Sequence, residues 1–212
     1  MSFAFKQSFA LIGESGSGKS LTLKALLGML PQELDAVMKY DASYVLQRGK
    51  NIAFVPQNPF TALSPLTKIE KQFMAPYEQA QKYLEMVGLE IAFLDRFPSE
   101  LSGGQLQRLI IAMALSIEPR LLLLDEPTTA LDEESKTTIL ELIYSLHQAY
   151  GFDLLFVTHD IGTIEHLCDE VGIIKNGKII EYGLTKKILY DPKEAYTKQL
   201  LESGFRQRSF RE

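Results

Sequence analysis

Short apolar runs alternate along this chain with segments whose apolar residues recur every three or four positions. The runs predict buried strands at residues 8–12, 52–55, 121–124 and 154–157, because unbroken apolar tetrads are typical of strands covered on both faces. The recurring positions predict helices from residue 19, at 66–75 and 78–87, after the turn at 102–104, and along a face of Ile139, Leu142, Ile143 and Leu146. Strands and helices that alternate in this way predict an α/β fold with a mainly parallel sheet.

Glycine and asparagine mark how some of these elements end. Asn176-Gly177 separates the apolar residues 171–174 from 178–181, a spacing typical of a two-residue β-hairpin turn. Gly88 suits the C-cap of the helix expected at 78–87. We therefore expect a hairpin late in the chain and a sharp helix end at Gly88.

The pattern becomes mainly helical between Pro59 and Pro98, which indicates a helical insertion into the α/β core. We expect one domain that consists of a core at 1–57 and 102–183, an inserted helical subdomain at 58–101 and a C-terminal helical tail at 184–212. The end of that tail carries Arg206, Arg208 and Arg211, and we expect it to be solvated.

Composition excludes several classes of protein. The 212 residues include 22 Lys and Arg against 27 Asp and Glu, and the net charge of −5 argues against an obligatory nucleic-acid binder. The lone Cys168 cannot form an internal disulfide, and no Cys/His cluster has zinc-site spacing. Lys6 interrupts an N-terminus that lacks secretory character, and the apolar stretch 109–117 is far shorter than the ~20 residues that span a bilayer. We expect a soluble, cytoplasmic domain whose membrane role, if it has one, depends on a partner.

A glycine-rich segment between the first strand and the first helix matches the pattern of a phosphate-binding loop. It consists of Gly13, Glu14, Ser15, Gly16, Ser17, Gly18, Lys19 and Ser20. Its glycines let backbone N–H groups surround phosphate oxygens, Lys19 would reach the β- and γ-phosphates, and Ser20 would ligate Mg²⁺. The alternative is a glycine-rich turn before a helix, but the position between strand and helix favours the phosphate loop.

Two carboxylates, Asp125 and Glu126, directly follow the strand at 121–124. Carboxyl ends of parallel strands are where open α/β sheets bind ligands, so Asp125 suits Mg²⁺ and Glu126 suits an attacking water. Alone, such a pair is more often a solvated strand end or an N-cap; together with the phosphate loop it favours a catalytic site. His159 follows another strand and would lie at the same sheet edge, near the γ-phosphate.

The most specific motif of the chain is the segment Leu101-Ser102-Gly103-Gly104-Gln105. With the phosphate loop, Gln57, the Asp125-Glu126 pair, Asp132 and His159, it resembles the ATP-binding subunit of an ABC transporter, and the motifs keep that family's order over residues 8 to about 183. The resemblance implies a P-loop NTPase fold with an inserted helical subdomain, and ATP and Mg²⁺ as cofactors.

The same resemblance implies roles for residues and partners. Two subunits would face each other head to tail, so that Ser102, Gly103, Gly104 and Gln105 of one cover the ATP on the phosphate loop of the other. Gln57 would contact Mg²⁺ and the water, Glu126 would be the general base, His159 the γ-phosphate contact, and Asp132 the link between the two sites. The partners implied are a second identical or paralogous ATPase subunit, two membrane permease subunits and, indirectly, an extracytoplasmic substrate-binding protein. The location implied is the cytoplasmic face of the inner membrane.

A finer match indicates the subfamily. Residues 126–132 (EPTTALD), 110–115 and the run from Asp191-Pro192 to Leu201 are similar to oligopeptide, dipeptide and nickel importers. The chain stops soon after that run and has only Cys168, which favours nickel or a related metal chelate over short peptides. Two rival readings are a soluble ABC ATPase that acts on nucleic acid or ribosomes, and a nucleotide-binding switch with weak hydrolysis. The acidic charge opposes the first reading, and Glu126 with His159 opposes the second.

The chain departs from the family upstream of its phosphate loop, where family members have an aromatic side chain that stacks on adenine. Only twelve residues precede Gly13, and their aromatics are Phe3, Phe5 and Phe9, of which Phe9 is expected in the core. Weak discrimination between ATP and GTP is therefore expected. The insertion also looks compact for the subfamily, so its docking geometry should differ from that of longer relatives.

Overall fold

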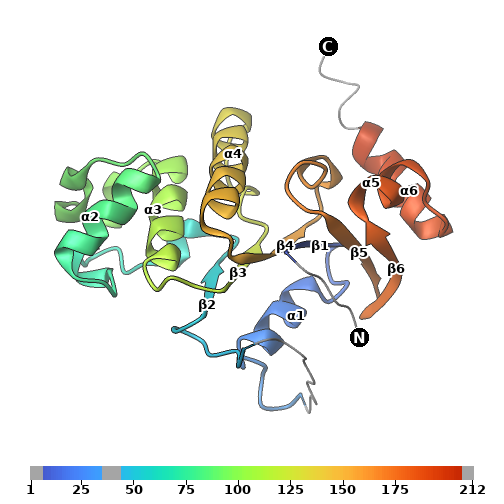
Figure 1. Ribbon diagram of the computed structural model, residues 1–212, viewed down its shortest axis with the longest axis horizontal. Coiled ribbons are helices and arrows are strands. Elements are labelled where there is room, and N and C mark those ends of the chain that lie inside the picture. Colours follow the sequence, from blue (N-terminus) through green and yellow to red (C-terminus); the bar gives the residue numbers. More distant parts are fainter. Residues whose placement is uncertain (1–6, 35–43, 207–212) are drawn as a thin grey trace. The chain divides into compact units, whose positions relative to one another are not determined.

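A computed structural model describes residues 7–34 and 44–206 of the protein, which form two compact units (Figure 1). The first unit combines the N-terminal segment up to Tyr44 with the segment that begins at Asp153. The second unit is Val45–Phe152. Each unit contributes its own strands and helices, and the two are described in turn.

The first unit is built on a mainly parallel sheet. Its central strand β1 (Ser8–Ile12) pairs in parallel with β4 (Asp153–Thr158) on one side and with β5 (Glu170–Lys175) on the other, and β6 (Lys178–Leu184) extends β5 in antiparallel. All five residues of β1 are buried, as is typical of a central parallel strand covered on both faces. The strands expected at 8–12 and 154–157 are thus confirmed.

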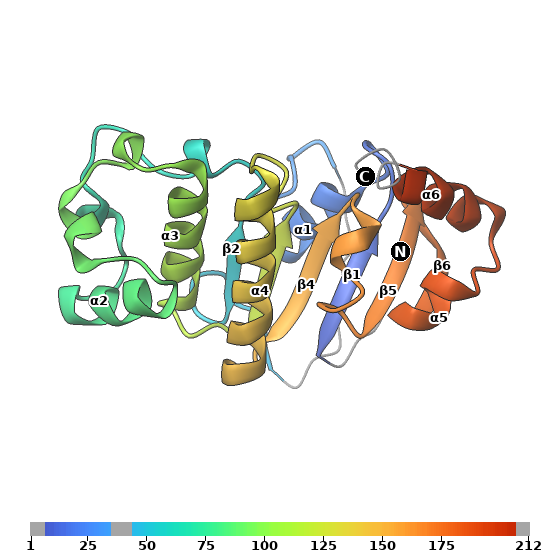
Figure 2. The same ribbon diagram turned by 90° about the horizontal axis from the view of Figure 1, so that it is seen from above.

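Helices cover this sheet on its faces and at its end. Helix α1 (Lys19–Leu26) lies on one face, while the β4–β5 connection with the short turn η5 (Ile161–Thr163) lies on the other (Figures 1 and 2). Two further helices follow β6, namely α5 (Thr185–Tyr190) and α6 (Ala195–Arg206), and α6 contacts η5.

The hairpin expected at Asn176-Gly177 is present. Both residues have positive φ, 49° and 74°, which is the backbone of the mirror-image turn that matches the twist of the flanking strands. Gly177 adopts this conformation without the steric cost that a Cβ would add. The turn fixes the register of β5 against β6, from Lys175 opposite Lys178 outward.

The second unit contains a parallel strand pair and three helices. Strands β2 (Ile52–Val55) and β3 (Leu121–Asp125) pair in register, with Ile52 opposite Leu121 and Val55 opposite Leu124. The helices are α2 (Tyr77–Met86), α3 (Gly103–Leu115) and α4 (Glu133–Tyr150), and α3 packs against α2, β2 and α4 (Figure 2). Short 3-10 turns complete the unit at η1 (Pro59–Thr61), η2 (Ile69–Gln72), η3 (Ile91–Asp95) and η4 (Pro98–Glu100).

The expected core face of α4 is only partly correct. Ile139, Ile143 and Leu146 are buried, whereas Leu142 is half-buried. The helix expected at 78–87 is α2, whose C-cap is Val87; Gly88 comes directly after it with a φ of 68°, the left-handed conformation in which glycine commonly ends a helix.

The helix expected at 66–75 is wrong, because only η2 forms there. Leu66 and Met74 are 88% and 85% exposed, so the apolar spacing does not create a face that a core could bury. Pro76 disfavours helical backbone at the residue before it. The Gln72 side chain instead bonds backbone atoms of Ser64 and the carbonyl of Thr67, which holds the segment as a loop.

Other features expected from composition can be compared with the described residues. Cys168 is free and buried, and that burial raises the pKa of its thiol. Among residues 7–34 and 44–206, no helix combines the length and apolar character needed to cross a bilayer. In the same part of the chain, His, Cys, Asp and Glu side chains do not gather in groups of three that could hold a metal. The arginines of the expected tail end, apart from Arg206, lie outside the described residues.

Candidate functional site

The phosphate-type loop occupies the turn between β1 and α1 in the first unit. Gly16 and Gly18 have φ of 79° and 108°, which lets the chain reverse around a central space before the helix begins. Lys19 is 5% exposed, and its ammonium donates hydrogen bonds to the carbonyls of Gly13 at 2.8 Å and Glu14 at 3.1 Å. A buried cation that donates to backbone carbonyls at a helix N-terminus fits the phosphates of a nucleotide.

The outer side of this loop rests on residues that its motif does not contain. A Cβ on Gly13 would lie 2.3 Å from the carbonyl oxygen of Ile174, so strand β5 packs directly on the loop. Gly177 donates its N–H to the Ser17 carbonyl at 2.9 Å. The hairpin turn was predicted as a turn, but nothing in the sequence connected it with the loop.

Tyr196 makes a second contact to the loop from outside the loop's own motif. Its hydroxyl accepts a hydrogen bond from the Glu14 N–H at 3.3 Å, and the side chain is buried. Tyr196 lies in the C-terminal run that indicated the subfamily, so the signal was present without a structural meaning.

His159 lies at the edge of the sheet that also carries the loop. β1 and β4 are parallel with Ile12 opposite Thr158, so Gly13 and His159 follow neighbouring strand ends. The Thr158 hydroxyl accepts a hydrogen bond from the Asp160 N–H at 2.9 Å, which shapes the turn. The expectation that His159 shares the loop's edge of the sheet is therefore met within the first unit.

The second unit brings Gln57 and Glu126 together. They follow the parallel strands β2 and β3, and the Gln57 amide donates to a Glu126 carboxylate oxygen at 3.2 Å. The Thr129 hydroxyl donates to the same oxygen at 3.2 Å. Asp125 is the last residue of β3 and is half-buried. Thr129 was quoted only as part of a motif, and the structure shows that it also orients Glu126.

The segment Ser102–Gln105 forms the start of α3. Ser102 is the N-cap, with its hydroxyl accepting from the Gln105 N–H at 3.3 Å, while the Gln105 side chain accepts from the Ser102 N–H at 3.0 Å. This reciprocal capping box occupies the Gln105 side-chain oxygen within its own chain. Gly103 and Gly104 occupy the first turn of α3, where helix N–H groups lack partners within the helix.

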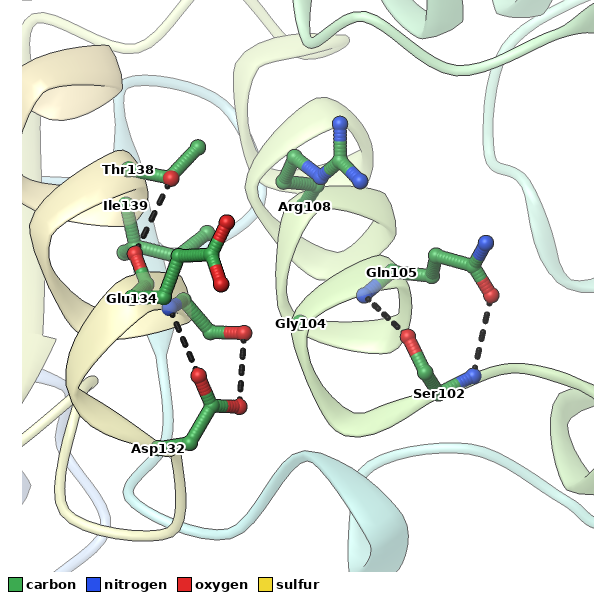
Figure 3. Close-up of a pocket in the computed structure, with 9 residues that line it drawn as sticks. Ser102, Gly104, Gln105, Arg108, Asp132, Glu134, Thr138 and Ile139 are labelled. Carbon is green, nitrogen blue, oxygen red and sulfur yellow. Dashed lines mark hydrogen bonds between the residues drawn. The ribbon is translucent and has the colours of Figure 1, made fainter.

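Asp132 is the N-cap of helix α4, and a small cavity separates it from Ser102 at the start of α3 (Figure 3). Its carboxylate accepts from the Ser135 N–H at 2.9 Å and from the Ser135 hydroxyl at 2.8 Å, and these bonds hold its pKa below the usual range. The cavity has a volume of about 370 Å³. It is lined by Ser102, Gly104, Gln105, Arg108, Asp132, Glu134, Ser135, Thr138 and Ile139.

The expected site residues thus fall into two groups that the structure describes separately. The phosphate loop and His159 belong to the first unit. Gln57, Asp125, Glu126, Ser102–Gln105 and Asp132 belong to the second. Phe9 is completely buried, as expected of a core residue, and its ring lies 5.9 Å from that of Tyr182; Phe3 and Phe5 lie outside the described residues.

Comparison with known proteins adds independent findings. Residues 1–129 match the family model described as ABC transporter. The oligopeptide transport ATP-binding protein OppD of Bacillus subtilis is 36% identical over 93% of this chain, and the chain spans 63% of that relative's length. The metal-staphylopine import system ATP-binding protein CntD of Staphylococcus aureus is 34% identical over 93% of this chain and 82% of its own length.

A solved structure shows the same fold. It is an ATP-binding cassette in a dimeric post-hydrolysis state bound to ADP and Pi, and the similarity has a TM-score of 0.68 at 29% identity. The alignment covers 84% of this chain and 85% of that one. The expected P-loop α/β fold with a mainly parallel sheet is confirmed.

Proposed function

The chain belongs to the ABC transporter family, and we propose that it is an ATP-hydrolysing subunit that powers import of a small solute through partner permeases. The observation that carries this proposal is the hydrogen-bonded pair of Gln57 and Glu126 beside Asp125, in a chain that also has a complete phosphate loop. Such a set suits phosphoryl transfer to water, in which positioning and charge stabilisation supply most of the catalysis.

We assign the phosphate contacts to residues 13–20. Backbone N–H groups of the loop would surround the phosphates, and the Lys19 ammonium would exchange its carbonyl partners for the β- and γ-phosphate oxygens. The Ser20 hydroxyl, the Asp125 carboxylate and the Gln57 amide oxygen would hold Mg²⁺, whose charge offsets that of the phosphates. All three are oxygen donors of the kind that Mg²⁺ prefers.

Glu126 is assigned as the general base and His159 as a contact to the γ-phosphate. The two donors on one carboxylate oxygen of Glu126, from Gln57 and Thr129, orient the carboxylate, which then accepts a proton from the attacking water. His159 follows the strand next to the loop and would bond a γ-phosphate oxygen.

The active form is proposed to be a head-to-tail dimer of this chain with itself or a paralogue. Ser102, Gly103, Gly104 and Gln105 of one subunit would cover the ATP of the other, with the N–H groups of Gly103 and Gly104 as donors, and Asp132 would link the two sites. Ser102, Gly104, Gln105 and Asp132 line one cavity at the starts of α3 and α4, which supports this arrangement.

Residues 58–101 are proposed as a helical subdomain inserted between core segments 1–57 and 102–183, with 184–212 as a C-terminal tail. The insertion would receive a permease at the cytoplasmic face of the membrane. Exposed apolar side chains there support a protein partner, with Phe60 at 56%, Leu66 at 88% and Met74 at 85% exposure.

We propose nickel or a related metal chelate as the imported solute, with dipeptides or oligopeptides as the second candidate. The Staphylococcus relative, named for metal-staphylopine import, supports the first, and the Bacillus relative, named for oligopeptide transport, supports the second. The substrate would be delivered by an extracytoplasmic binding protein.

The experiment is transport with the chain assembled on a candidate pair of permease subunits. Proteoliposomes that contain ATP inside should accumulate radioactive nickel, supplied with a chelator and the binding protein, and a Lys19→Ala variant should abolish accumulation. Uptake of a labelled dipeptide in place of nickel would select the second candidate. ATP hydrolysis that neither permease nor solute stimulates would contradict the transport proposal.

A further inference from the structure

We infer that Tyr196 is a positioning residue for the phosphate-binding loop, through which the C-terminal helix α6 sets the affinity of the site for nucleotide. The inference rests on the proposed assignment of this loop to the phosphates of ATP. It begins with a single peptide group, the one that joins Gly13 to Glu14.

That peptide is held from both sides. Its carbonyl oxygen, on Gly13, accepts a hydrogen bond from the Lys19 ammonium at 2.8 Å. Its N–H, on Glu14, donates to the Tyr196 hydroxyl at 3.3 Å. Because a trans peptide is planar and directs its N–H and C=O in opposite directions, these two contacts together fix its rotation.

Tyr196 is itself firmly placed. The side chain is 8% exposed, and the Lys175 ammonium lies 4.3 Å from the centre of its ring, a distance at which a cation is attracted to the aromatic face. Lys175 is the last residue of β5, next to Ile174, which packs on Gly13. The ring and the loop therefore rest on the same strand end.

The start of α6 is fixed independently of the loop. The Glu181 carboxylate on β6 accepts hydrogen bonds from the backbone N–H groups of Lys193 at 2.7 Å and Glu194 at 3.2 Å. These contacts tie the segment before Ala195 to the hairpin, and so place Tyr196 one residue into the helix. A shift of α6 would be transmitted to the loop through the hydroxyl.

Loss of this hydroxyl should weaken nucleotide binding without disturbing the fold. When Lys19 exchanges the Gly13 carbonyl for phosphate oxygens, the Gly13–Glu14 peptide would then keep neither of these two contacts and could rotate. Ordering it during binding lowers affinity by about two- to tenfold, the contribution of one neutral hydrogen bond. Tyr196 does not touch the reacting atoms in this scheme, so the turnover rate at saturating ATP should stay unchanged.

The test compares Tyr196→Phe, Tyr190→Phe and Lys19→Ala with wild type in the purified full chain. Tyr190→Phe is the matched control, because its hydroxyl donates to the Glu165 carboxylate at an exposed position and not to the loop. Titration with a fluorescent ATP analogue should show a dissociation constant two- to tenfold higher for Tyr196→Phe and unchanged for Tyr190→Phe. The Glu14 amide should exchange with deuterium faster in Tyr196→Phe, while the melting temperature stays within about 3 °C.

The outcomes distinguish a failure of the role inferred for Tyr196 from a failure of the proposed phosphate site. Lys19→Ala should bind nucleotide far more weakly; if it binds like wild type, the loop is not the phosphate site and the proposed function fails. If Lys19→Ala loses binding but Tyr196→Phe keeps wild-type affinity, only the role of Tyr196 is overturned. A rise in KM with an unchanged kcat in the permease complex supports positioning, and a fall in kcat alone contradicts it.

Discussion

The Gln57 side-chain amide donates a hydrogen bond of 3.2 Å to the Glu126 carboxylate, although 69 positions separate the two residues in the chain. The parallel pairing of β2 with β3 produces this contact, since Val55 lies opposite Leu124 and the two residues each come two positions after this pair. Glu126 also has a φ of 46°, a conformation that non-glycine residues adopt rarely and that tends to mark functional sites. The carboxylate is thus aimed by backbone as well as by side-chain contacts.

Replacing Glu126 with glutamine should leave ATP binding intact and stop turnover. The amide keeps the size of the side chain and one oxygen that can accept from Gln57 and Thr129, but it cannot take a proton from water. We expect hydrolysis to fall by roughly 10²–10⁴-fold, the usual contribution of a general base. Phosphate release and nucleotide binding measured on the same preparation check this.

Thr129→Val provides a graded control, since it removes one donor to Glu126 and keeps the carboxylate. Its turnover should lie between those of wild type and Glu126→Gln. Undiminished hydrolysis in Glu126→Gln would remove Glu126 from the role of base.

The two glycines at the start of α3 should differ in their tolerance of alanine. A Cβ on Gly104 would approach the Ser135 hydroxyl to 3.0 Å and its Cβ to 3.3 Å, whereas one on Gly103 meets Leu131 at an ordinary 3.4 Å. Crowding of this kind costs about 1 kcal/mol or more, so Gly104→Ala should melt roughly 2–4 °C lower than Gly103→Ala. Calorimetry of the matched pair checks this, and equal melting temperatures would show that Ser135 moves aside freely.

Acid should remove the stabilisation that Asp132 gives to α4. The hydrogen bonds from Ser135 lower the pKa of Asp132 in the folded chain. A lowered folded-state pKa means that the contribution is complete above the unfolded value, about 3.9, and is lost as pH falls through the folded value. Urea unfolding at pH 7 should show wild type more stable than Asp132→Ala, and the difference should decrease as the pH falls below the unfolded-state pKa of Asp, about 3.9. A difference that is constant with pH would exclude the ionised cap.

Local patterns predicted most of the elements that carry the site. Strand β2 at Ile52–Val55 follows from an apolar run, and the start of α3 at Gly103 follows from the turn at 102–104 and the recurring apolar residues after it. Both signals lie within a few residues of the structure they specify. The prediction of a helix at 66–75 is wrong because its apolar residues have helical spacing but Leu66 and Met74 among them are exposed. Burial depends on packing partners that a periodic pattern does not identify.

The site residues likewise divide into those that local patterns predict and those that only long-range contacts place. Gln57 and Glu126 could be placed at strand ends, and parallel pairing then brought them into contact. The support of the loop by Gly177 and Tyr196 could not be predicted, since these contacts span 160 or more residues and leave no periodic trace. The Asp132–Ser135 cap was equally hidden, because the resemblance assigned Asp132 to an interface rather than to its own helix.

Replacing glycines of the phosphate loop with alanine should destabilise the protein for different physical reasons at Gly13 and at Gly16. At Gly13 a Cβ would meet the Ile174 carbonyl oxygen at 2.3 Å and the Ser17 hydroxyl at 2.7 Å, and the carbonyl belongs to the backbone of a buried strand that cannot easily move. At Gly16 a Cβ would meet nothing within 4 Å, so only its φ of 79° opposes the change, at about 1–2 kcal/mol. Gly13→Ala should therefore lower the free energy of unfolding by about 3 kcal/mol or more and melt at least 6 °C below wild type. The melting temperature of Gly16→Ala should lie between those of wild type and Gly13→Ala. Nucleotide titration should follow the same order, because displacing Gly13 also displaces the carbonyl that holds Lys19. Gly13→Ala with wild-type stability would mean that β5 does not pack on the loop as described.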